Sequence, residues 1–263
     1  MASKLSIKDL YRPALAEGEG IGTAYEYYAK RLLLIPWLVK LGLLQEMLIA
    51  GLPQKYGSSL DFLLLGAEFR MAVTVVDDRP EALAALNSSL AALSDAGFRL
   101  PRSPRLVLAD DLTTLYTLKE RFDLAISSEV LQRFGPDDRP AYLHRLRELA
   151  QAVAIFTPNA DNAAHVGRSG LNGLRLDELR ALCEHGPAAN DHKLVTSGYV
   201  DMPPFPPGIT RTEEQREEAA TGFAEGAAMR GLAYYAQIER FAPAAARRRW
   251  SHIVYALCGP VPR

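Results

Sequence analysis

Short apolar runs alternate with segments of helical periodicity along most of this chain. Runs of this kind predict strands within residues 46–51, 73–78, 105–111, 122–128, 152–159, 193–202 and 251–258. Apolar residues at helical spacing predict helices over 60–69, 79–93 and 176–186. This alternation is typical of a parallel sheet with crossover helices. The pattern therefore favours a single large α/β fold.

The two ends of the chain depart from this alternation. Residues 1–44 begin with a polar, glycine-containing stretch, predicted to be loose, and continue into a helical-period segment. They predict an N-terminal helical arm or lid. Residues 45–263 predict the α/β domain, with a helical excursion near 213–241. The proline-rich segment Tyr199–Gly208 predicts a rigid lip over one edge of the sheet.

Charge and composition narrow the class of partner and the compartment. The chain has 30 basic and 31 acidic residues, so it lacks the basic surplus expected of a nucleic-acid-binding protein. Lys40 and Glu46 interrupt its longest apolar stretch, which argues against a transmembrane segment. Cys183 and Cys258 lie far apart in the sequence and predict reduced thiols in a cytoplasmic protein. Both a homo-oligomer and a subunit of a complex stay open.

Acidic residues follow two of the predicted strands. In a parallel sheet, ligands bind beyond the carboxyl ends of the strands. Asp77 ends the second strand, where a carboxylate can accept both hydroxyl hydrogens of a ribose; the alternative is a helix N-cap, a role also open to Asp78. Asp110 and Asp111 end the third strand, where an acceptor can meet an adenine amino group. Their alternative role is to solvate a loop or to cap a helix.

The loop that follows the first strand is a candidate anion site. Gly51 and Gly57 allow a ligand to approach the backbone, and the N–H groups at a helix N-terminus favour a carboxylate or phosphate. Ser58 or Ser59 is expected to cap that helix. The alternative is an ordinary strand-to-helix turn, because the loop carries neither G-x-G-x-x-G nor G-x-x-x-x-G-K-[ST].

Four segments resemble successive motifs of the class I S-adenosylmethionine-dependent methyltransferases. They are VTVVDDRPEALAAL, LVLADDLTTL, FDLAISSEVLQRF and AVAIFTPN, and the resemblance covers roughly residues 46–185. It implies a Rossmann-like, seven-stranded, mostly parallel sheet with helices on both faces. The final pair, KLVTSGYVDM and SHIVYALC, fits the terminal antiparallel hairpin of that family. The implied cofactor is S-adenosylmethionine.

The resemblance also assigns roles to particular residues. It implies that Asp77 binds the ribose and that Asp110 or Asp111 lies beside the adenine. It implies that Ser127 and Glu129, which close the fourth strand, border the methionine moiety and the substrate. The chain departs from the family in its first motif, where AGLPQKYGSS replaces an acid followed by G-x-G-x-G.

Two readings of this altered loop stay open. Lys55 is placed to pair with a cofactor carboxylate, whereas Tyr56 is placed to block the pocket. Glu129 and His165 are the candidates for an acid or base near a transferred methyl group. The alternative for His165 is a solvent-facing loop position. Tyr25 and Tyr28 on the arm are predicted to face the proline-rich lip across the carboxyl edge, although aromatics at helical spacing are also typical of a core.

These features predict methyl transfer from S-adenosylmethionine to a small-molecule acceptor. A first alternative is a catalytically inactive methyltransferase-like binding or scaffold subunit, which the altered first loop motivates. A second alternative is a nicotinamide-dependent oxidoreductase, because an acid after the second strand is common to both classes. The missing G-x-G-x-x-G and the terminal hairpin count against the oxidoreductase.

Overall fold

A seven-stranded sheet forms the centre of the protein in the computed structural model, which describes all residues except 1–4, 56, 186–191, 205–213, 215–221 and 261–263. The strands are β1 (Glu46–Ala50), β2 (Ala72–Asp77), β3 (Arg105–Leu108), β4 (Phe122–Ser128), β5 (Ala150–Pro158), β6 (Lys193–Val200) and β7 (Ile253–Gly259). Their order is β3-β2-β1-β4-β5-β7-β6, and only β7 runs antiparallel to its neighbours. The predicted fold class is thereby confirmed.

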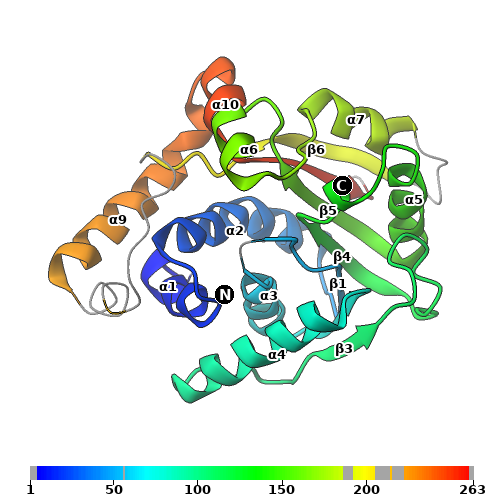
Figure 1. Ribbon diagram of the computed structural model, residues 1–263, viewed down its shortest axis with the longest axis horizontal. Helices are drawn as coiled ribbons and strands as arrows, with labels where there is room; N and C mark the ends of the chain where they lie inside the picture. Colours follow the sequence, from blue (N-terminus) through cyan, green and yellow to red (C-terminus); the bar gives the residue numbers. More distant parts are fainter. Residues whose placement is uncertain (1–4, 56, 186–191, 205–213, 215–221, 261–263) are drawn as a thin grey trace.

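Helices cover both faces of the sheet (Figure 1). They are α1 (Ile7–Ala16), α2 (Ile21–Leu41), α3 (Leu60–Phe69), α4 (Pro80–Asp95), α5 (Arg139–Leu149), α6 (Ala163–Ser169), α7 (Leu176–His185), α9 (Phe223–Ile238) and α10 (Ala244–Trp250), with short 3-10 turns η1 (Leu131–Arg133) and η2 (Glu239–Phe241). Alternate strand residues enter two separate cores, because successive side chains point to opposite faces. In β1, for example, Met47 and Ile49 enter one core, and Leu48 and Ala50 enter the other.

The N-terminal segment is a packed helix and not the loose stretch predicted from its polar composition. Ser6 and Asp9 form a capping box that starts α1. The apolar face of α1, which includes Leu10 and Tyr11, is fully buried in the core shared with the sheet. Helices α1, α2 and α9 pack against one another beside the sheet (Figure 1). The division of the chain into an arm over 1–44 and a domain over 45–263 stays a prediction.

One edge of the sheet collects residues from distant parts of the sequence. Strands β1 to β6 all end there, because β6 runs parallel to β5 with β7 between them. β7 runs in the opposite direction, so its first residue lies at this edge. Ile253 pairs with both Pro158 at the end of β5 and Val200 at the end of β6. Residues just before β7 therefore reach the carboxyl edge.

The sequence argued against a transmembrane segment and predicted that both cysteines are reduced. Within the described residues, none of the helices combines the length and hydrophobicity that a membrane crossing requires. Cys183 on α7 and Cys258 on β7 are both free and buried. Although they are far apart in the sequence, the two thiols perturb each other's pKa, which is raised for Cys183 and lowered for Cys258.

Candidate functional site

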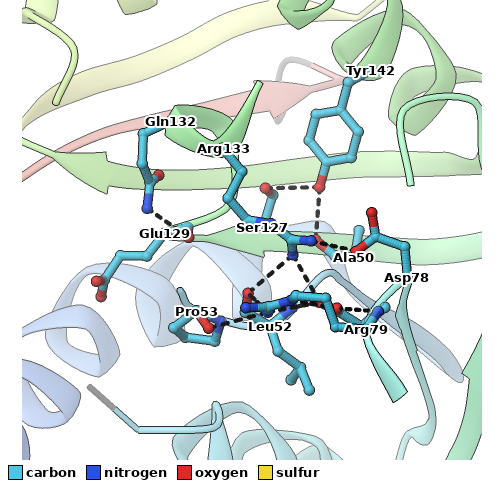
Figure 2. A network of polar contacts seen from close by, with 11 residues as sticks. Ala50, Leu52, Pro53, Asp78, Arg79, Ser127, Glu129, Gln132, Arg133 and Tyr142 are labelled. Atoms are coloured by element: carbon cyan, nitrogen blue, oxygen red, sulfur yellow. Dashed lines mark hydrogen bonds and ion pairs between the residues drawn. The ribbon is translucent and has the colours of Figure 1, made fainter. Parts of the chain in front are cut away.

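Asp77 lies at the end of β2, and its side chain is fully buried among hydrogen-bond donors (Figure 2 shows the donors). Its Oδ2 accepts hydrogen bonds from the backbone N–H of Leu52 at 2.6 Å and from Nη1 of Arg133 at 2.9 Å. Its Oδ1 accepts from the backbone N–H and Nε of Arg79 at 2.9 and 2.8 Å. Burial acts to raise the pKa of this carboxyl, but the bonds from Arg79 and Leu52 and the charge of Arg133 outweigh it and hold the pKa low.

The neighbouring acid, Asp78, completes the same network. It forms an ion pair with Arg133, whose guanidinium therefore bridges two consecutive carboxylates (Figure 2). Neither acid is the N-cap residue of α4. That position belongs to Arg79, which makes no side-chain cap bond, and Pro80 is the first helical residue. The two arginines that hold Asp77 carried no signal in the sequence.

The N-terminus of α3 binds a carboxylate, as the loop composition predicted, but the carboxylate belongs to Glu17. Its Oε1 accepts hydrogen bonds from the backbone N–H of Ser58 at 2.7 Å, from the Ser58 hydroxyl at 2.9 Å and from the backbone N–H of Leu60 at 3.0 Å. The Tyr27 hydroxyl donates to its second oxygen. The expectation of a serine cap is wrong, since Ser59 at the N-cap position makes no side-chain cap bond.

Two glycines permit the tight course of this loop. Gly51 and Gly57 have φ of +82° and +75°, a region that favours glycine. A Cβ on Gly57 would lie 2.8 Å from the Tyr27 hydroxyl and 3.0 Å from Oε2 of Glu17. Lys55 reaches away to the carbonyl oxygen of Ser169 at the end of α6, at 2.5 Å. Tyr56 lies outside the described residues.

The acids after β3 are exposed, in contrast to Asp77. Asp111 accepts hydrogen bonds from the backbone N–H of Thr113 at 2.8 Å and from the hydroxyl of Thr114 at 3.0 Å. It therefore caps the following turn, whereas the alternative given from the sequence was to solvate a loop or to cap a helix. Asp110, beside it, is also exposed and lies on the same edge of the sheet as Asp77.

Buried polar residues close β4. Ser127 accepts a hydrogen bond from the Tyr142 hydroxyl at 2.9 Å, and this hydroxyl also lies 2.7 Å from the carbonyl oxygen of Ala50 (Figure 2). Ser128 accepts a hydrogen bond from the ammonium of Lys30 at 2.9 Å. The hydroxyl groups of Ser127 and Ser128 thus both have buried hydrogen-bond partners from outside the strand, Tyr142 and Lys30.

Glu129 continues from Ser128 in a left-handed conformation, with φ of +55°. Its backbone is fixed on both sides, because its N–H donates to the carbonyl of Phe156 at 2.8 Å and its carbonyl accepts from Gln132 at 2.7 Å. Burial and the charge of Glu26 raise the pKa of the Glu129 carboxyl well above its usual value, against the opposing charge of Lys30. Burial thus disfavours the charged form of this carboxyl.

The ammonium of Lys30 lies beside these residues at the end of β4. Its side chain is almost fully buried and pairs with Glu26, with the Glu129 carboxyl 3.9 Å away. The same ammonium lies 5.6 and 5.5 Å from the ring centres of Phe62 and Phe156, within range of a cation–π contact. No sequence pattern identified Lys30, which occurs inside a helix whose other residues are mostly apolar.

His165 on α6 stacks on a second histidine, His252, which directly precedes β7. The ring centres are 4.3 Å apart and the planes are inclined by 17°. Burial and the neighbouring charge of His252 lower the pKa of His165 to about 4. Nδ1 of His252 in turn lies 2.9 Å from Oδ2 of Asp201, which follows β6. Sequence analysis missed His252, because it lies in an apolar run that predicts only a strand.

The predicted contact between the N-terminal helices and the segment after β6 is present in the described residues. The Tyr25 hydroxyl lies 3.5 Å from the carbonyl oxygen of Met202 and also donates to Glu239. Glu239 accepts from the backbone N–H groups of Asp201 and Met202 at 3.2 and 3.0 Å. The remainder of the proline-rich lip, from residue 205 on, lies outside the described residues.

Two cavities among the described residues lie away from this site. One of about 300 Å³ is bordered by Met71 and Val73 at the start of β2, and one of about 280 Å³ by Phe122 and Ala150 at the starts of β4 and β5. Both therefore open at the amino edge. At the carboxyl edge, the chain's own side chains fill the space beside Asp77 and the N-terminus of α3.

Comparisons with known proteins identify the fold. The sequence matches no family model and no curated protein. The structure is similar to magnesium protoporphyrin IX methyltransferase from Synechocystis PCC 6803 with bound SAH, at 11% identity over 89% of this chain and 83% of that chain, with a TM-score of 0.50. It is also similar to the methyltransferase domain of bacterial CtHen1, at 14% identity over 89% and 99% of the two chains, with a TM-score of 0.51. The chain thus has the class I S-adenosylmethionine-dependent methyltransferase fold.

Proposed function

We propose that this protein transfers a methyl group from S-adenosylmethionine to a small-molecule acceptor at the carboxyl edge of its sheet. The observation that carries the proposal is the ionised carboxylate of Asp77 at the end of β2 in a methyltransferase fold. Ligands of doubly wound sheets bind at this edge, and a carboxylate at this point suits a ribose diol. A cytoplasmic location and the absence of a nucleic-acid partner belong to the same proposal.

The residues present fit the chemical groups of the cofactor. Asp77 would accept the ribose hydroxyls, and the N–H groups of Ser58 and Leu60 would bind a carboxylate, as they bind that of Glu17. Asp110 is exposed on the adenine side of the same edge. Loading requires that the side chains of Arg133 and Glu17 leave these positions.

The cofactor would supply an electrophilic methyl carbon on a positively charged sulfur. The chain's own share is to align the acceptor and to exclude water, since proximity and orientation account for much of such a rate enhancement. Lys30 donates a hydrogen bond to Ser128 and lies beside Glu129, so it holds the polar groups at the end of β4 in place. Glu129 and His165 stay predicted as acid or base, with both side chains at the same edge.

Parallel calorimetric titrations with S-adenosylmethionine, S-adenosylhomocysteine and NAD test the proposal. We expect the first two to bind and NAD not to bind. Asp77→Asn keeps the shape of the side chain but removes its charge, and should weaken S-adenosylhomocysteine binding by roughly tenfold to a hundredfold. Asp95→Asn, at an exposed position on α4, is the matched control.

The remaining outcomes separate the alternatives. A folded protein that binds none of the three ligands would support the inactive scaffold subunit. Binding of NAD alone would support the oxidoreductase. Unchanged affinity of Asp77→Asn for S-adenosylhomocysteine would remove Asp77 from the site.

A further inference from the structure

An aspartate–histidine pair lies at the carboxyl edge, at the opposite end of this edge from Asp77. Asp201 follows the last residue of β6 and His252 precedes the first residue of β7, and these strands are paired at Val200 and Ile253. The backbone N–H of His252 donates to the carbonyl of Asp201 at 2.7 Å. Two residues 51 positions apart in the sequence are therefore held together by the sheet itself.

The carboxylate of Asp201 is buried in the protein interior. Only 3% of its side-chain surface is exposed, and its Oδ2 lies 2.9 Å from Nδ1 of His252. Its Oδ1 is buried without a hydrogen-bond partner among the described residues. The residue has φ of +65°, a conformation that costs energy for any residue except glycine and that clusters at functional sites.

The imidazole of His252 is oriented by this carboxylate and reaches the surface. A carboxylate at Nδ1 favours the tautomer with the proton on that nitrogen, which leaves the lone pair of the neutral ring on Nε2. The side chain keeps 18% of its surface exposed. Within the described part of the chain, no group hydrogen bonds to Nε2, so this atom is open to a ligand at the edge.

The groups that face His252 set its basicity. They are Asp201 at the end of β6, His165 on α6, Glu26 on α2 and Glu239 on η2. Burial lowers the pKa of His252, but the charge and hydrogen bond of Asp201, with smaller contributions from Glu26 and Glu239, raise it further than burial lowers it. His165, with a pKa near 4, is the weaker base of the stacked pair.

We propose that Nε2 of His252 is the base that takes the proton from the acceptor, and that the acceptor reacts through a hydroxyl group. The proposal rests on the proposed methyl transfer. The proton of the acceptor O–H goes to Nε2, and an electron pair of the oxygen forms the new bond to the methyl carbon. The electron pair of the carbon–sulfur bond leaves with the sulfur. An oxygen nucleophile needs such a base, whereas a tertiary amine or a thioether carries no proton to remove.

The ring titration of His252 tests the pair without turnover. In two-dimensional NMR spectra of ring-labelled protein, we expect one imidazole to titrate above the ordinary histidine value of about 6.5. That signal should vanish in His252→Gln and move to lower pH in Asp201→Asn. A His252 that titrates at or below the ordinary value, with no response to Asp201→Asn, would overturn the assignment.

Transfer of a labelled methyl group to a panel of phenols, primary amines and thiols tests the acceptor class. We expect the phenols to be methylated, and kcat to fall by roughly a hundredfold or more in His252→Gln, with KM little changed. In Asp201→Asn the acidic limb of the rate profile should shift to lower pH. His144→Gln, on α5 and away from the site, is the control.

Binding of S-adenosylhomocysteine to the wild type and to His252→Gln distinguishes a failure of the role proposed for His252 from a failure of the proposed methyl transfer. A protein that binds this ligand but methylates no phenol, or whose phenol methylation is unaffected by His252→Gln, overturns the role of His252 and leaves the methyltransferase proposal standing. A wild-type protein that does not bind the ligand at all overturns both.

Discussion

Arg133 reaches from the turn after β4 to the carboxylate of Asp77 at the end of β2, with Nη1 2.9 Å from Oδ2. The same side chain lies 3.4 Å from the carbonyl oxygen of Leu52 in the loop after β1. One guanidinium therefore connects the carboxyl ends of β1, β2 and β4. It covers Oδ2 of Asp77, whereas Oδ1 accepts from Arg79.

Removal of Arg133 should expose Asp77 to a ligand. We expect Arg133→Met to bind S-adenosylhomocysteine up to about tenfold more tightly than the wild type, because the ligand no longer displaces a hydrogen bond between charged groups worth about 1.5 kcal/mol. Calorimetric titration measures the change, and Arg99→Met at an exposed position is the control. Weaker binding by Arg133→Met would place the guanidinium among the groups that hold the ligand.

Loss of the Glu17 carboxylate should destabilise the fold. Glu17→Ala leaves the N–H groups of Ser58 and Leu60 and the Tyr27 hydroxyl without an acceptor, at an expected cost on the order of 2–4 kcal/mol in unfolding free energy. Glu184→Ala, at an exposed position on α7, is the control in the same urea titration. Added acetate should restore part of the loss, since a small carboxylate fits the vacated N–H groups. An unchanged midpoint would show that Glu17 does not hold α3.

Gly57 offers a steric test of the same contact. Gly57→Ala should lower the free energy of unfolding by more than Gly97→Ala does. Both glycines have positive φ, at +75° and +83°, so the backbone strain of the two substitutions is similar. At Gly57 the added Cβ would meet Glu17 and Tyr27, whereas at Gly97 no atom of the described residues lies within 4 Å. The difference between the two variants, on the order of 1–3 kcal/mol, measures this crowding. Equal effects would contradict it.

Asp61 in the first turn of α3 makes stability depend on pH. Among the described residues, neither of its buried carboxylate oxygens has a hydrogen-bond partner, and burial raises its pKa to about 7, against the opposing charge of Lys30. The folded state therefore holds this proton more tightly than the unfolded chain, whose ordinary aspartate pKa is about 3.9. By linkage, the contribution of Asp61 to stability is full below pH 4 and is lost as the pH rises through 7.

Asp61→Asn should remove this dependence. We expect the variant to be more stable than the wild type above pH 7, by on the order of 2–4 kcal/mol, and to differ little from it near pH 4. Thermal unfolding across that pH range provides the measurement, with the exposed Asp95→Asn as control. A wild-type stability that does not fall between pH 4 and 7 relative to Asp61→Asn would show that the Asp61 carboxyl is not buried as described.

The strands and several helices were predictable because their signals are local. The apolar runs correspond to the observed strands, and the segment 60–69 has the bounds of α3. The location of Asp77 at the carboxyl edge could be predicted because a residue that ends a parallel strand must lie at that edge of the sheet. The fold class followed from the alternation of these elements.

The partners of the site residues could not be predicted, because distant contacts decide them. Glu17 lies in a polar stretch that has no periodicity, and only the packing of α1 and α2 brings it to α3. The sequence around Arg133 indicates only a surface residue of a turn. The partners of His252 follow from the pairing of β6 with β7 and from the position of α6, which the apolar run around it does not specify. Composition likewise predicted a loose N-terminus, where an apolar face folds α1 against the core.

The carboxylate of Glu17 makes ligand binding and the docking of the N-terminal helices competing events. A ligand carboxylate at the N–H groups of Ser58 and Leu60 must first displace Glu17, and the two cannot be bound together. Such coupling is reciprocal, so the ligand loosens the helices by the same factor by which the docked helices weaken the ligand. The affinity that an experiment reports is then the intrinsic affinity scaled by the fraction of molecules in which Glu17 is already undocked.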